Sequence, residues 1–279
     1  MWTMIAPDIW RAISSVAERS KGNPILDGLQ VTLNFHPDAP CRGRLTIEAL
    51  CDDGFYRSQF ETGTSNGSLT AHPGGHRWVW ESRIFGSAYD SADPALRPKY
   101  GALNYRKQPT GGSPRFGSSH LRLRPHVLSR TTFCYPDSYF DPANFGVQDR
   151  MGLIELAEQN GSMVDFLDDY IEAHVHGLLS LANDVDALVL DASYRGTRVE
   201  AIAASLPCAV EWHSGFRMPE SQLRECVKYR GQEYAALAAS LMIGSELTPR
   251  DVGAALCRGV SDPQSLKKIW HCVARFGRP

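Results

Sequence analysis

Three ionisable side chains alternate with apolar residues along the short segment 170–176. These are Glu172, His174 and His176. Alternation of this kind predicts a strand that carries all three on one face. Core packing explains such a row poorly, so we interpret Glu172 as a catalytic carboxylate in a cleft, with the two histidines shaping its environment. The structural alternative is a solvated outer face of a sheet.

The same segment has a second chemical interpretation. His174 and His176 form an H-x-H pair, and this spacing occurs among metal ligands on strands. Together with Asp191 and His213 they would bind a divalent metal and support a metal-dependent hydrolase. The sequence does not show these four residues converging, so the main interpretation expects no metal.

Arg57 stands at the start of a segment rich in small, hydroxylated and glycine residues, 56–67. A strand end followed by many backbone donors can bind a phosphate-bearing ligand, and the guanidinium offers paired donors. The structural alternative is an ion pair with an acid such as Glu61. The candidate ligand-binding residues of this segment are Arg57, Thr62, Gly63, Thr64 and Ser65.

A serine pair follows Gly117 at the expected mouth of a later strand. Ser118 and Ser119, with His120 after them, are further candidates for ligand binding. Serines in such a place often satisfy local backbone groups instead. Their functional interpretation gains weight only if Arg57 and Glu172 face the same cleft.

The hydrophobic pattern places these residues in an α+β chain. Alternating or continuous apolar runs predict strands over 29–35, 116–127, 130–133, 170–176, 186–191 and 208–213. Helical spacing and helix-start signals predict helices near 8–21, 151–169 and 199–204 and three more after 220. Residues 62–117 are rich in Gly and Pro and are expected to be irregular but ordered, because aromatic residues interrupt them. Repeated βαβ units are missing, which argues against a doubly wound nucleotide-binding fold.

Length and composition limit the function classes. The chain has 279 residues, 43% of them apolar, and a net charge of −2. A net charge so close to zero argues against a general nucleic-acid or anionic-membrane binder. Seven scattered cysteines without a C-x-x-C pair, and the lack of a signal peptide, favour free thiols in a reducing compartment. No apolar run is long enough for a transmembrane helix. The loop signatures of dehydrogenases, P-loop enzymes and α/β-hydrolases are absent.

Four longer motifs carry a resemblance to a known family. They are YRSQFETGTSNG at 56–67, RPKYGALN at 97–104, PRFGSSHLRL at 114–123 and YIEAHVHG at 170–177. Together they resemble a bacterial family of unknown function whose members are thought similar to ADP-ribosyltransferases. In the Arg–Ser–Glu class of these enzymes, the three named residues lie in order on successive strands. Arg57, Ser118 and Glu172 match that order, although the serine element reads Gly-Ser-Ser-His and Tyr170 stands where many members carry a second acid.

The resemblance implies a fold and a reaction. The expected fold is an ADP-ribosyltransferase-like core of two packed, mainly antiparallel sheets over 25–217, with a packing helix over 1–24 and a helical extension over 218–279. NAD is the expected co-substrate, held by Arg57 and the glycine-rich segment. Glu172 would stabilise the oxocarbenium-like centre that forms when the nicotinamide–ribose bond breaks.

The expected partner is a protein or small-molecule acceptor, and water as acceptor would make the protein an NAD glycohydrolase. A non-catalytic NAD-binding or ligand-binding module is a further alternative. We expect action in the cytoplasm, or in another cell as an effector secreted without a cleavable signal.

Overall fold

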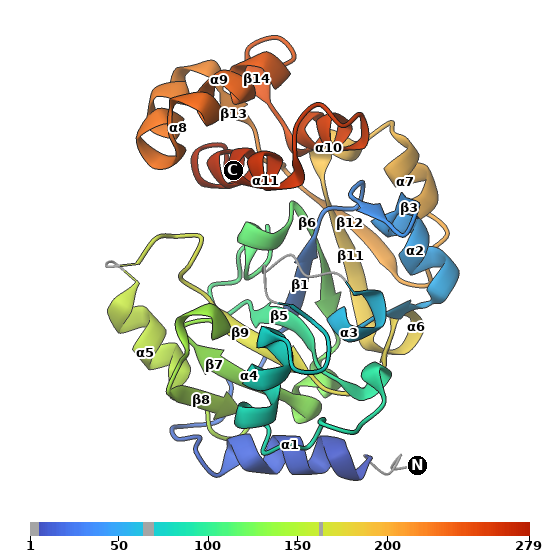
Figure 1. Cartoon of the computed structure of the whole chain (residues 1–279), viewed down its shortest axis with the longest axis vertical. Helices are drawn as coiled ribbons and strands as arrows, with labels where there is room; N and C mark the ends of the chain where they lie inside the picture. The colour runs from blue at the N-terminus through green and yellow to red at the C-terminus, as the bar shows by residue number, and fades with distance from the viewer. Residues whose placement is uncertain (1–5, 64–69, 162–163) are drawn as a thin grey trace.

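The computed structural model describes residues 6–63, 70–161 and 164–279. Their strands form one mixed eight-stranded sheet, in the order β12-β11-β6-β1-β5-β9-β7-β8, and three two-stranded sheets. Only β11 and β12 pair in parallel within the large sheet. Figure 1 shows the helices α8 to α11, here called the C-terminal helices, above the large sheet, with α1 at its opposite end. The chain is therefore an α+β protein.

The strands of the large sheet are short. They are β1 (Val31–Phe35), β5 (Lys99–Leu103), β6 (Ser119–Leu123), β7 (Thr131–Tyr135), β8 (Asn144–Val147), β9 (Ile171–Val175), β11 (Val185–Asp191) and β12 (Ala209–His213). The small sheets pair β2 (Pro40–Cys41) with β3 (Arg44–Leu45), β4 (Phe55–Tyr56) with β10 (Leu179–Ser180), and β13 (Met218–Pro219) with β14 (Glu246–Leu247).

The α-helices lie mostly around the large sheet or beyond its end. They are α1 (Pro7–Ala17), α2 (Thr46–Asp53), α3 (Gln59–Thr62), α4 (His76–Ile84), α5 (Leu153–Asn160), α6 (Leu181–Asp184), α7 (Arg198–Ala203), α8 (Leu223–Arg230), α9 (Gln232–Leu241), α10 (Pro249–Cys257) and α11 (Pro263–Phe276). Short 3₁₀ turns include η2 (Pro114–Phe116). Within the described residues, no helix combines the length and the apolar character that a membrane span requires.

The pairing of strand β5 explains why the structure has one large sheet, whereas two packed sheets were predicted. It pairs with β1 on one side and with β9 on the other, so it joins the two groups of strands. The sequence places β5 inside the segment that was expected to be irregular, and this expectation was wrong for both β5 and α4. At Gly101 a Cβ atom would lie 2.5 Å from the carbonyl oxygen of Thr32, so the close pairing of β5 with β1 requires glycine.

The two faces of the large sheet differ in character. One face carries the main apolar core, which includes Leu33, Phe133 and Ala173 and is covered in part by α2, α5 and α7. The opposite face carries polar residues at neighbouring positions, because His174 of β9 lies directly opposite Thr132 of β7. We call this the polar face. Helices α1 and α4 cover its lower part with a smaller apolar cluster.

The C-terminal helices have an apolar cluster of their own, to which Phe216 and Trp270 belong. Gly231 separates α8 from α9, where the sequence pattern predicted one continuous helix. Thr248 and Asp251 form a capping box at the start of α10, and Asp262 caps α11 through two backbone N–H groups. Helices α10 and α11 lie within the region after 220 where the sequence predicted helices.

Candidate functional site

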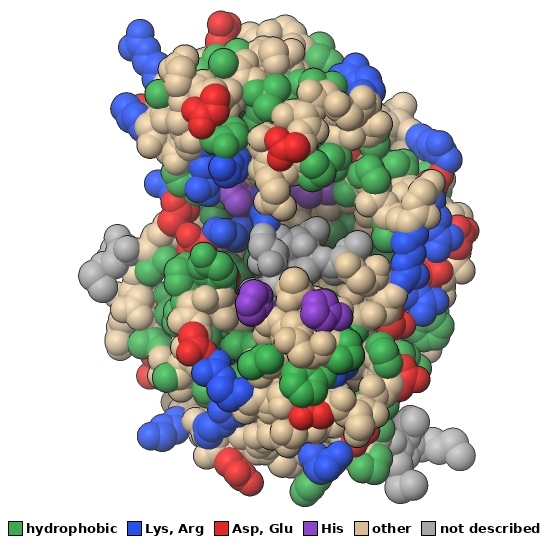
Figure 2. Space-filling model, in the orientation of Figure 1, with side chains coloured by type: hydrophobic (Ala, Val, Ile, Leu, Met, Phe, Trp, Pro, Cys, Tyr) green, Lys and Arg blue, Asp and Glu red, His purple; other side chains and the backbone are tan. Residues whose placement is uncertain are grey.

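A cavity of about 550 Å³ opens on the polar face, between α4 and the C-terminal helices. We call it the central cavity. Figure 2 shows the surface hollowed beneath the C-terminal helices, with basic side chains beside the hollow. Its volume falls in the range of small-molecule sites. Seven cationic side chains line it: Arg42, Arg44, Arg57, Arg77, Lys99, Arg115 and Lys267. Three carboxylates line it: Asp53, Asp137 and Glu172. The excess of cations favours an anionic ligand.

Glu172 on β9 is one of two buried carboxylates of the central cavity, the other being Asp137, whereas Asp53 is partly exposed. Its side chain is 7% exposed, and it accepts hydrogen bonds from Ser138 Oγ at 3.1 Å and from His174 Nε2 at 3.0 Å. Burial alone would raise the pKa of Glu172, but His174 first, and then Arg77 and Ser138, hold it below its ordinary value. The carboxylate is therefore ionised at neutral pH and fixed in position.

The two histidines of β9 form a buried chain of hydrogen bonds behind Glu172. His174 Nδ1 lies 3.1 Å from Thr132 Oγ1, which lies 2.9 Å from His176 Nε2. His176 Nδ1 lies 2.7 Å from the hydroxyl of Tyr89. Both imidazoles are fully buried, which excludes the structural alternative of a solvated outer face. These hydrogen bonds hold His174 in one orientation towards Glu172.

Arg77 on α4 is a site residue that the sequence analysis missed. Its side chain is almost fully buried, and Nη1 donates to Ser138 Oγ at 2.9 Å. The guanidinium lies over the ring of Tyr100, 4.0 Å from the ring centroid, and its Nε has no hydrogen-bond partner among the described residues. Arg77 and Ser138 together connect a buried positive charge to the carboxylate of Glu172. The available sequence signal was the spacing of Arg77 and Glu81, which is that of neighbours on a helix.

Asp137 is a second carboxylate of the central cavity that the sequence analysis did not single out. It accepts hydrogen bonds from the backbone N–H of Tyr139, at 2.9 Å, and from the hydroxyl of Tyr170. Burial, and then the charge of Glu172, raise the pKa of Asp137. Two carboxylates of one cavity thus have pKa values moved in opposite directions, as acid–base pairs of active sites often do.

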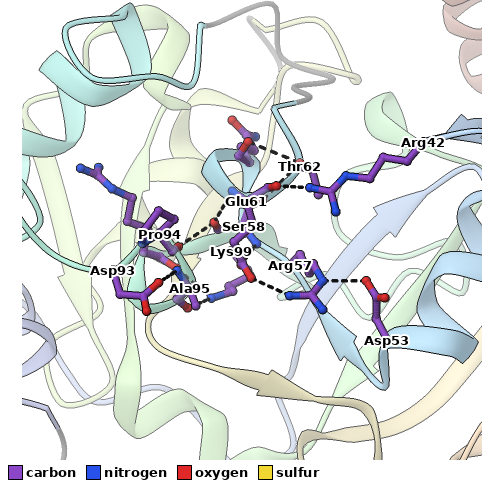
Figure 3. Close-up of polar contacts among 12 residues, drawn as sticks. Arg42, Asp53, Arg57, Ser58, Glu61, Thr62, Asp93, Pro94, Ala95 and Lys99 are labelled. Atoms are coloured by element: carbon purple, nitrogen blue, oxygen red, sulfur yellow. Dashed lines mark hydrogen bonds and ion pairs between the residues drawn. The ribbon is translucent and has the colours of Figure 1, made fainter.

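Arg57 lies on the cavity wall away from Glu172, after β4. Its Nε donates to Asp53 at 2.6 Å and its Nη1 to Glu61 at 3.0 Å, as Figure 3 shows. These hydrogen bonds raise its pKa, the bond to Asp53 having the larger effect. The ion pair with Glu61 that the sequence analysis gave as the structural alternative is therefore present. Arg57 and Glu172 do line the same cavity.

The remaining ligand-binding candidates of this segment have different positions. Thr62, the last residue of α3, lines the central cavity, and Gly63 ends that helix with a φ of 65°. Thr64 and Ser65 lie outside the described residues.

Ser118, Ser119 and His120 are not brought together with Glu172. All three are buried, none lines the central cavity, and two strands, β1 and β5, separate β6 from β9. Ser119 Oγ accepts a hydrogen bond from the backbone N–H of Asp191 at 3.1 Å, which is the local backbone role given above as the alternative. Ser118 Oγ lies 3.5 Å from the hydroxyl of Tyr194.

The four residues of the metal interpretation separate into two groups. Asp191 and His213 are register neighbours on β11 and β12, at the far end of the sheet from β9. The described residues contain a different group whose possible ligand atoms lie within 4.8 Å of one another, formed by Cys134, Glu172 and His174. In it Glu172 and His174 bond directly to each other, so a metal ion would have to replace that hydrogen bond.

Comparison with known proteins gives a family match over most of the chain. No curated protein matches its sequence. Residues 30–158 and 153–275 match the family described as "Protein of unknown function (DUF3626)". The two matched segments contain every element from β1 to α10 and nearly all of α11. The chain therefore belongs to the DUF3626 family.

Proposed function

We propose that the protein is an NAD-dependent ADP-ribosyltransferase. The observation that carries the proposal is the position of Glu172, a buried and oriented carboxylate on the wall of a cavity whose other charged lining residues are mostly cations. A dinucleotide needs such a combination, since its diphosphate is anionic while its reacting sugar develops positive charge. The likeness of the core to the ADP-ribosyltransferase fold is part of this proposal.

The chemistry follows from the charges of the site. When the nicotinamide–ribose bond breaks, its electron pair leaves with nicotinamide and the ribose C1′ gains oxocarbenium character. The ionised Glu172 stabilises this positive charge, and Ser138 and His174 keep the carboxylate from turning away. Arg77 balances the buried negative charge in the resting protein.

Asp137 is suited to the second half of the reaction. The nucleophile of the acceptor attacks C1′ and loses a proton, which needs a base in the same cavity. Asp137 lines that cavity, and its raised pKa makes it a better proton acceptor than an ordinary aspartate. Water in place of the acceptor gives NAD hydrolysis.

The test is release of nicotinamide from NAD by the purified protein, with Glu172→Gln as the variant. Because Gln keeps the size but not the charge, we expect kcat to fall about 100- to 1000-fold while ADP-ribose still binds. Glu211→Gln on β12 is the matched control, since that side chain is 46% exposed and pairs with Arg122. Full turnover by a folded Glu172→Gln protein would exclude the proposed role.

The closeness of Cys134, Glu172 and His174 favours one second candidate, a metal-dependent hydrolase. Elemental analysis of the purified protein separates the two. A bound transition metal, with activity lost to a chelator, would support the hydrolase, whereas metal-free protein that cleaves NAD would support the transferase. Binding of NAD without turnover in the presence of any acceptor would indicate a ligand-binding module.

A further inference from the structure

Four hydrogen-bonded side chains form a row that ends on the carboxylate of Glu172. The row runs from Tyr89 through His176 and Thr132 to His174, and all four side chains are fully buried. None of the four lines the central cavity. They therefore cannot touch a ligand there, and any effect that they have on its chemistry must pass through Glu172.

Aromatic rings separate this row from water. Phe85 packs edge-on against both imidazoles, with ring centroids 5.6 Å apart for His174 and 5.1 Å apart for His176. The ring centroid of Trp80 lies 5.2 Å from that of His174. In such surroundings a polar group left without a hydrogen-bond partner costs about 1–3 kcal/mol. Each group of the row therefore has to find its partner within the row.

The hydroxyl of Tyr89 fixes the direction of the first hydrogen bond. It lies 2.7 Å from Nδ1 of His176, and the described part of the chain offers this hydroxyl no other hydrogen-bond partner. Burial lowers the pKa of His176 well below its ordinary value, so its ring is neutral and has one donor and one acceptor nitrogen. If Nδ1 were the donor, the hydroxyl hydrogen of Tyr89 would have no acceptor. Tyr89 therefore donates to His176.

The directions of the remaining hydrogen bonds follow from the first. Because Nδ1 of His176 accepts, the ring proton is on Nε2, which donates to Thr132 Oγ1 over 2.9 Å. The single hydroxyl hydrogen of Thr132 is then directed to Nδ1 of His174, 3.1 Å away. Since this Nδ1 accepts, the proton of His174 is on Nε2, which donates to Oε1 of Glu172 at 3.0 Å. Every group of the row is satisfied in this arrangement.

The row thus selects one tautomer and one ring orientation of His174. A neutral imidazole can carry its proton on either nitrogen, and the hydrogen bond made by one nitrogen determines which form is present. In the other tautomer, a lone pair of Nε2 would face the ionised carboxylate of Glu172. The hydroxyl of Thr132 prevents this by donating to Nδ1.

We propose that Tyr89, His176 and Thr132 are positioning residues, which set the tautomer of His174 and thereby fix the carboxylate of Glu172 on the cavity wall. Their effect on catalysis rests on the proposed function, whereas the tautomer is a property of the protein without ligand. A carboxylate held in this way needs no reorganisation when positive charge develops on the substrate.

The first test reads the tautomers of the wild-type protein by ¹⁵N NMR of its imidazole groups, without ligand. We expect a protonated Nε2 and an unprotonated Nδ1 in both His174 and His176. A protonated Nδ1 in either ring would overturn the proposal. We also expect the Nδ1 resonance of His174 to shift in Thr132→Val, which removes its donor, and to stay in place in Thr132→Ser.

The second test measures NAD cleavage by the same two variants. We expect kcat to fall about 10-fold in Thr132→Val with KM within about twofold of the wild type, because the carboxylate is present but less well oriented. Thr132→Ser keeps the hydroxyl and should retain kcat within about twofold. Tyr89→Phe removes the hydroxyl at the far end of the row and should also lower kcat. It provides a second variant if Thr132→Val does not fold.

Thr131→Val is the matched control, because it makes the same change one residue away on β7. The hydroxyl of Thr131 is also buried, but it donates to the backbone carbonyl of Val127 at 2.8 Å, outside the row. We expect this control to keep the wild-type kcat and the wild-type resonance of His174 Nδ1.

Equal loss of kcat in Thr132→Val and Thr132→Ser, or no loss in either Thr132→Val or Tyr89→Phe, would overturn the positioning role. These outcomes are distinct from failure of the proposed function. A wild-type protein that shows the expected tautomers but leaves NAD uncleaved would refute the transferase and support the assigned hydrogen bonds. NAD cleavage by a protein with a protonated Nδ1 in either ring would support the transferase and refute the positioning residues.

Discussion

His120 on β6 offers a direct test of how burial controls the stability of the large sheet. Its imidazole is 3% exposed, and Nδ1 has no hydrogen-bond partner among the described residues. Burial, and then the nearby His213 and Arg122, lower its pKa from 6.5 to about 3. The perturbation is His120→Leu, which removes the titrating ring and keeps an apolar side chain.

Proton linkage gives the sign and size of the effect of pH on stability. Between pH 6.5 and about 3, the unfolded chain binds a proton at His120 that the folded protein does not bind, so the stability of the wild type falls as the pH falls. The full slope is about 1.4 kcal/mol per pH unit, and the unfolded imidazole is half protonated at pH 6.5, so acidification from about pH 6.5 to about pH 4.5 costs about 2.3 kcal/mol from this residue alone. The result depends mainly on the pKa in the unfolded chain, because pH 4.5 is still above the pKa in the folded one.

The assay is urea unfolding of wild type and His120→Leu across this pH interval. We expect the free energy of unfolding of the variant to fall less steeply with acidification, by about 2.3 kcal/mol over the interval. His72→Leu is the control, since His72 is exposed and its change should leave the wild-type slope intact. His120→Gln provides a second variant if the leucine does not fold. A His120 variant with the wild-type slope would refute the reasoning, and with it the assignment of His120 as a buried neutral residue.

Three further substitutions test other parts of the structure. Asp137→Asn should lower the rate of ADP-ribose transfer about 100-fold without weakening ADP-ribose binding, and an unchanged rate would remove Asp137 as the base. Arg57→Ala should change the free energy of unfolding by less than about 1 kcal/mol in a urea titration, because the side chain is 37% exposed and its ion pairs are screened by solvent. A larger loss would show a structural role beyond those pairs. Gly117→Ala should cost about 3 kcal/mol or more by the same measurement, since its Cβ would lie 2.0 Å from the carbonyl carbon of Phe35, and a protein of wild-type stability would contradict this packing.

Elements with regular patterns and clear start signals were predicted well. Strand β9 alternates polar and apolar residues, and α11 begins at Pro263 after the capping residue Asp262, so both lie where the sequence placed them. Strand β5 was missed because it contains Lys99 and Gly101, residue types that are depleted in strands. Lys99 is tolerated there because backbone carbonyl groups accept all its hydrogen bonds, which only the folded chain reveals.

Some residues of the candidate site could likewise be predicted from the sequence, and others could not. Glu172 could be selected from the sequence because its neighbours His174 and His176 lie on the same strand. Arg77 could not, since it is a buried cation on a helix whose mixed composition conceals which face points inwards. Asp137 comes from a different strand end, and only the pairing of β7 with β9 brings it near Glu172.

The indole Nε1 of Trp270 on α11 donates hydrogen bonds to the carbonyl oxygens of Pro114 and Arg115 in η2, and this contact has a consequence for synthesis of the protein. Chains fold from the N-terminus as they leave the ribosome, and the strands of the large sheet are complete in the sequence by His213. Lys267, the residue of α11 that lines the central cavity, is made more than fifty residues later. A nascent chain can thus form its sheet while the cavity is still open on one side. We therefore expect the site to bind no ligand until α11 packs against η2.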